Sequence, residues 1–123
     1  MIFLDHTAVL ALCRGHRLLS GIAVVEVPDP AQRAHVPALC LVAASLDLPG
    51  ANAHVGALPG LEFLPLDFAA AAAVEDAVAA GVDWRYSHAV FASVSGAAEG
   101  QVLTATPDAY DGTGVWAVDI GKP

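Results

Sequence analysis

The chain has 123 residues, a length typical of one domain and sufficient to bury a core without disulfides or metals. Its formal net charge is −8, with 13 acidic and only five basic residues, so strong nonspecific binding to nucleic acid is disfavoured because that binding depends on basic groups. No apolar run approaches the roughly 18 residues of a membrane span, and "MIFLDHT" lacks the basic start of a signal peptide. We therefore expect a cytoplasmic protein, without membrane association, that forms a single domain over residues 1–123.

The first half of the chain predicts two short strands separated by helices. "IFLD" is a short apolar run typical of a buried strand, and "HTAVLALCRG" has apolar residues at helical spacing. "HRLLSGIAVVEV" is compatible with helix or strand, and its length favours a helix. After the loop "PDPAQR", a short strand precedes the helix "PALCLVAASL", whose first turn suits Pro37. "AHVGAL" predicts another short helix.

The second half carries clearer boundaries. "LEFLPLD" predicts a strand, and Asp67 is a natural N-cap for the helix "FAAAAAVEDAVAAG", which Gly81 ends. Asp83 is placed to cap the next helix, "WRYSHAVFASVSG". "QVLTA" then predicts a strand, "PDAY" a helical turn and "GVWAVDI" a last strand.

Short apolar strands that alternate with helices predict a parallel sheet covered on both faces. The expected fold is therefore an α/β/α three-layer sandwich with right-handed crossovers. The predicted strands begin near Ile2, Arg33, Leu61, Gln101 and Val115.

The cysteines and histidines show no metal-binding spacing. Cys13 and Cys40 lie far apart in apolar surroundings, which favours two free buried thiols over a disulfide. The five histidines form neither an HxH nor an HExxH pattern, so a zinc site is disfavoured.

Four segments, in this order, are typical of one nuclease family: "IFLDHTAVLAL", "HVPALCLVAA", "LEFLPLD" before an alanine-rich helix, and "DWRYSHAVFAS" followed by "QVLTATPDAY". Over nearly its whole length the chain resembles the PIN-domain nucleases, whose toxin members are held by small antitoxin proteins and often dimerise. The resemblance implies a PIN-like fold. It also implies a carboxylate cluster that binds Mg²⁺ or Mn²⁺, which would activate water and stabilise charge on an RNA phosphate.

Most of the acids that this family uses are missing. Asp5 matches the first acid, the second falls at about Ala43, His88 stands in place of the third, and Thr106 in "LTAT" replaces the fourth. Thr104, the hydroxyl that accompanies the fourth acid, is present. One carboxylate and one imidazole cannot hold Mg²⁺ firmly, so we expect a degenerate site without a bound metal, with Asp5 as the metal ligand if there is one.

The residual site has both functional and structural interpretations. Asp5 is also a favoured helix N-cap, and Asp108, in the first turn of a predicted helix, also suits the helix dipole. A carboxylate buried without metal needs partners, so we expect Asp5 to accept a hydrogen bond from a threonine hydroxyl, with His88 in reach and its pKa raised. The candidate residues are Asp5 and His88, with Thr7, Thr104, Thr106 and Asp108 lining the same crevice.

Two functions remain open at this point. The first is a PIN-like protein that has lost its metal chemistry and acts by binding an antitoxin-like protein partner or by self-association as a homodimer, with weak or absent RNA binding. The second is a divergent Mg²⁺- or Mn²⁺-dependent ribonuclease of a toxin–antitoxin pair that uses Asp5, His88 and Asp108, with Asp111 as a further ligand. A small-molecule pocket in the same crevice is a third interpretation, and no glycine-rich phosphate loop supports it.

Overall fold

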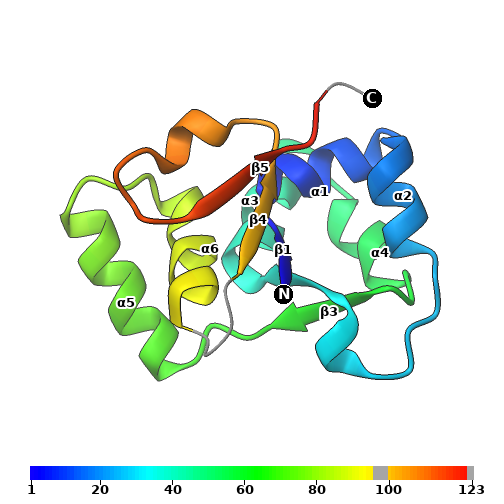
Figure 1. The fold of residues 1–123 in the computed structure, drawn as a ribbon, viewed down its shortest axis with the longest axis horizontal. Helices are drawn as coiled ribbons and strands as arrows, with labels where there is room; N and C mark the ends of the chain where they lie inside the picture. The colour runs from blue at the N-terminus through cyan, green and yellow to red at the C-terminus, as the bar shows by residue number, and fades with distance from the viewer. Residues whose placement is uncertain (96–99, 122–123) are drawn as a thin grey trace.

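The computed structural model describes residues 1–95 and 100–121, and these residues form a five-stranded, all-parallel sheet between helices (Figure 1). The strands lie in the order β3-β2-β1-β4-β5. The predicted α/β sandwich is thereby confirmed, and each strand begins within one residue of its predicted start. The strands are β1 (Ile2–Leu4), β2 (Ala34–Pro37), β3 (Leu61–Leu64), β4 (Gln101–Thr104) and β5 (Trp116–Asp119).

Helices cover both sides of this sheet. Figure 1 shows α5 and α6 on one side and α1, α2 and α4 on the other. The segment "HRLLSGIAVVEV" is helical only as far as Ala23, and Pro37 ends β2 at the N-cap position of α3 rather than lying inside its first turn. The helices are α1 (His6–Cys13), α2 (Arg17–Ala23), α3 (Ala38–Asp47), α4 (Ala51–Gly56), α5 (Phe68–Ala79) and α6 (Trp84–Ser95), with the short 3-10 helices η1 (Pro30–Gln32) and η2 (Pro107–Tyr110).

The centre of the sheet is apolar on both faces. Phe3 and Leu4 of β1, Val36 of β2 and Val102 of β4 are all buried. Strands covered by helices on both sides lose the alternation of apolar and polar residues, which explains the continuous apolar runs in the sequence. The core therefore lies along β1 and its two neighbours.

The order of the strands fixes where the polar residues meet. β1 pairs with β2 on one side and with β4 on the other, in parallel, with Leu4 opposite Leu103. The chain moves outward from β1 in one direction through β2 and β3, then returns to form β4 and β5 on the other side. Ligands of open α/β sheets bind at such a switch point, outside the carboxyl ends of the strands. Asp5 and Thr104 lie at this point.

Two remaining sequence predictions can be compared with the structure. Both cysteines are free thiols, as expected, but only Cys40 is buried, whereas Cys13 is half-buried. No helix in the two described ranges is long and apolar enough to cross a membrane.

Candidate functional site

The candidate site is centred on Asp5, directly after β1. Asp5 has extended backbone geometry and is the N-cap of α1, where its side chain accepts a hydrogen bond from the backbone N–H of Ala8 at 3.0 Å. The residue is completely buried. A short polar side chain is favoured at this position because it satisfies an N–H that has no partner within the helix.

Both carboxylate oxygens of Asp5 accept hydrogen bonds from side chains. The hydroxyl of Thr7 donates to Oδ1 at 2.6 Å, and the hydroxyl of Tyr110 donates to Oδ2 at 2.7 Å. Together with the Ala8 N–H, three uncharged donors therefore stabilise this buried acid by hydrogen bonding. The expected hydrogen bond from a threonine hydroxyl is present, and Thr7 supplies it.

A row of threonine hydroxyls leads from Asp5 to the residues at the end of β4. Thr7 has a single hydroxyl proton, and it goes to the carboxylate, so Thr7 Oγ1 accepts from the N–H of Ala105 at 2.8 Å and from the hydroxyl of Thr104 at 3.1 Å. Thr104 in turn accepts from the N–H of Thr106 at 3.1 Å, and the two hydroxyl oxygens lie 3.4 Å apart. Proton counting thus orients the row of hydroxyls toward Asp5.

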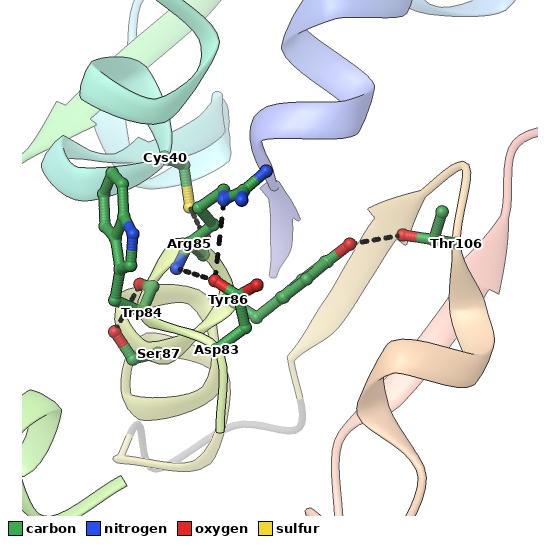
Figure 2. A network of polar contacts seen from close by, with 7 residues as sticks. All are labelled: Cys40, Asp83, Trp84, Arg85, Tyr86, Ser87 and Thr106. Atoms are coloured by element: carbon green, nitrogen blue, oxygen red, sulfur yellow. Dashed lines mark hydrogen bonds and ion pairs between the residues drawn. The ribbon is translucent and has the colours of Figure 1, made fainter. Parts of the chain in front are cut away.

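Tyr86 of α6 completes the row at the exposed side. Its hydroxyl lies 3.0 Å from Oγ1 of Thr106, and Figure 2 shows the ring reaching across from α6 to the turn after β4. The Tyr86 ring also packs edge-on against Tyr110 at 5.3 Å and His6 at 4.9 Å between ring centroids. Tyr86 therefore packs against two aromatic side chains and also contacts the polar site. We call Asp5, Thr7, Tyr86, Thr104, Thr106 and Tyr110 the Asp5 network.

Tyr110, like Tyr86, is a member of the Asp5 network that the sequence analysis does not predict as part of the site. It lies at the end of η2 and is buried, and burial, followed by the adjacent carboxylate of Asp5, raises the pKa of its phenol well above the ordinary value. It therefore stays protonated and acts as a fixed donor. The only sequence signal was its position three residues after Pro107, on a helical turn that directly follows β4.

His88 has a different environment from the one expected. Its Nδ1 accepts a hydrogen bond from the backbone N–H of Leu39 at 3.3 Å, at the start of α3. Burial lowers the pKa of His88, and the charge that opposes this effect is Asp67 rather than Asp5. The expectation of a raised pKa is therefore wrong, because α6 directs this histidine against α3, where the effect of desolvation on the imidazole exceeds that of the Asp67 charge.

The histidine nearest to Asp5 in sequence is His6, the first residue of α1. It is buried, and desolvation lowers its pKa despite the opposing charge of Asp5. A neutral imidazole at this position packs against Tyr86 and adds no positive charge to the site.

The other candidate acids lie on the surface. Asp108 and Asp111 are exposed on and after η2, and neither carboxylate hydrogen-bonds to any member of the Asp5 network within the described residues. Ala43, at the position of the second acid, is buried in α3. The structure thus joins Asp5 to Thr7, Thr104 and Thr106, while His88 and Asp108 have no hydrogen bond to them.

The Mg²⁺ or Mn²⁺ that the resemblance implies does not fit these residues. These cations need several oxygen ligands with negative charge, whereas here one carboxylate is present and both of its oxygens accept hydrogen bonds from the protein. Across residues 1–95 and 100–121, no three His, Cys, Asp or Glu side chains lie close enough to hold a metal ion. The surrounding groups are uncharged hydroxyls, whose protons are used in hydrogen bonds within the Asp5 network.

Comparisons with known proteins find no matching family model, no matching curated protein and no matching solved structure.

Proposed function

We propose that this chain is a PIN-like protein that has lost the metal chemistry of that fold and acts by binding another protein. One observation carries the proposal: the single acid at the carboxyl end of β1 is fully buried, and both of its carboxylate oxygens accept hydrogen bonds from the protein. In a metal-dependent nuclease an acid at this point must face a cation and its water. Here it stabilises the start of α1 and the turn after β4.

The Asp5 network has the chemistry of a structural site. It joins α1, β4, α6 and η2, four elements that are distant in the sequence. Removing one partner from such a buried network leaves an unsatisfied group, which costs free energy of unfolding. The surface charge supports protein binding over RNA cleavage, since 13 acidic residues against five basic ones would repel a phosphate backbone.

The test is a cleavage assay on single-stranded RNA with Mg²⁺ or Mn²⁺. We expect wild type, Asp5→Asn and Asp108→Asn to give the same background, and calorimetry to detect no Mn²⁺ binding that depends on Asp5. The carboxylate of Asp108 is exposed and accepts no hydrogen bond in the described chain, so Asp108→Asn tests the alternative ligand set without disturbing folding. Divalent-dependent cleavage that is lost in either variant would overturn the proposal and support the divergent ribonuclease.

A further inference from the structure

The outermost strand β5 has one free backbone edge. It pairs in parallel with β4, and no other strand of residues 1–95 and 100–121 lies beside it. Trp116, its first residue, is 54% exposed. An unpaired edge strand offers a row of N–H and C=O groups to which an extended peptide can add.

A small cavity lies beside this edge, between η2 and β5. Its volume is about 280 Å³, and the residues that line it include Tyr110, Trp116 and the acids Asp108 and Asp111. Neither carboxylate has a hydrogen-bond donor or an ion-pair partner among the residues that the structure describes. We call this hollow the η2–β5 cavity.

The size and chemistry of the η2–β5 cavity indicate its occupant. Small-molecule pockets usually have about 300–1,000 Å³, so this hollow is better suited to one inserted side chain. Two unpaired carboxylates attract a cation, and Trp116 in the lining is a residue type that also binds cations. A lysine or arginine side chain satisfies both requirements, and arginine can also bind a carboxylate through two parallel hydrogen bonds.

A second hollow lies next to the η2–β5 cavity, and Asp111 lines both. It has a volume of about 610 Å³, lies between η2 and the neighbouring ends of α5 and α6, and is lined by Asp83, Asp111, Tyr86 and apolar groups. Asp83 is 3.6 Å from the guanidinium of Arg85, so Asp111 is the free charge shared by the two hollows. Successive side chains of one extended segment would meet acidic and aromatic groups in both.

We propose that the β5 edge and the η2–β5 cavity bind an extended basic segment of another protein, with one lysine or arginine side chain in the cavity. The proposal rests on the proposed function, since it names the chemistry of the partner. A second copy of this chain is a poorer occupant, because each copy carries a net charge of −8 and like charges oppose association.

The experiment uses a synthetic peptide with capped ends in which valine and arginine alternate over nine residues, and a matched peptide with glutamine in place of arginine. Calorimetry measures affinity, and ¹⁵N amide shifts locate the site. We expect the arginine peptide to bind with shifts confined to β5, η2 and the neighbouring ends of α5 and α6, and to bind more weakly as the salt concentration rises. The double variant Asp108→Asn with Asp111→Asn should weaken binding about tenfold, which corresponds to about 1.4 kcal/mol.

The control variant, Glu75→Gln with Asp76→Asn, makes the same change in net charge on the exposed face of α5 and should retain wild-type affinity. Equal binding of the glutamine peptide, equal weakening in the control variant, or shifts centred elsewhere would overturn the inference. So would a dimer in sedimentation that Trp116→Ala dissociates, because a second copy would then occupy the edge. RNA cleavage is measured on the same preparations. If the peptide does not bind and no RNA is cleaved, this inference is rejected while the proposed function stands.

Discussion

The phenol of Tyr110 donates a hydrogen bond to Asp5 at 2.7 Å although 105 residues separate the two along the chain. Asp5 follows the central strand, and Tyr110 ends the helical turn that leads from β4 toward the sheet edge. The contact therefore couples the first turn of α1 to η2. It also occupies the oxygen that a metal ion would need, which gives it consequences for both stability and function.

Removing the Tyr110 hydroxyl should destabilise the protein. Tyr110→Phe leaves Oδ2 of Asp5 buried without a donor, so we expect the free energy of unfolding to fall by about 1–3 kcal/mol in urea denaturation. Tyr86→Phe is the matched control, because its hydroxyl bonds Thr106 at the exposed side, where water can replace it. An equal loss in both variants would contradict the assigned role of the buried contact.

The two aspartate N-caps should differ in importance. Asp67→Ala removes one hydrogen bond to the N–H of Ala70 at an exposed helix start, with an expected cost of about 1 kcal/mol. Asp5→Ala removes the equivalent cap and also leaves Thr7 and Tyr110 without their acceptor, so its cost should be clearly larger. Thermal and urea unfolding of both variants measure the difference. Similar losses would show that the network adds nothing beyond the cap.

Stability should fall when the solution is acidified below about pH 6.5, the ordinary pKa of histidine. Burial lowers the pKa of His6, His35 and His88 in the folded chain. Between the folded and unfolded pKa values the unfolded chain binds more protons, so this stability is fully present above about pH 6.5 and is lost as the pH falls through the folded values.

His88 offers a direct test of this pH dependence. Its Nδ1 must stay unprotonated to accept the hydrogen bond from Leu39 N–H, so His88→Gln should reduce the loss of stability between pH 7.5 and 5.5. Urea midpoints at both pH values measure the change. If the stability of His88→Gln falls with pH as steeply as that of wild type, His88 is not one of the groups that cause the loss of stability in acid.

Two glycines should respond to alanine in opposite directions. A Cβ at Gly60 would lie 2.3 Å from the carbonyl oxygen of Ile22 and 2.8 Å from that of Ala23, which are backbone atoms that cannot easily move. Gly60→Ala should therefore destabilise by about 1–3 kcal/mol. Gly21 lies inside α2 with nothing within 4 Å of its Cβ position, so Gly21→Ala should stabilise by about 0.5–1 kcal/mol. Differential scanning calorimetry of both variants gives the signs.

Local features of the fold were predictable from the sequence by itself. The starts of the five strands and the caps at Asp5 and Asp67 were predicted, because an N-cap bonds an N–H only three residues away. The helix over residues 16–27 was predicted too long. Its β-branched end, "VVEV", contains no glycine or proline to mark the end of the helix in the sequence. In the structure the helix ends at Ala23.

The candidate site was predictable only where the residues follow directly from a strand end. Asp5, Thr7 and Thr104 met as expected, since β1 and β4 are neighbouring parallel strands that end at the same edge. His88 was misassigned because a position on a helix face does not show which neighbour that face will meet. Its partner, Leu39, depends on how α6 packs against α3.

The sequence by itself determined the fold class and the shortage of acids, because both follow from which residues are present and how they are spaced. Only the tertiary structure decided that both carboxylate oxygens of Asp5 are hydrogen-bonded within the protein, because Tyr110 reaches Oδ2 through the order of the strands and the path of η2. The same holds for the η2–β5 cavity, which forms where two segments fold beside each other and leave Asp108, Asp111 and Trp116 around one hollow. Contacts of this kind are set by packing between distant segments, on which local propensity has no influence.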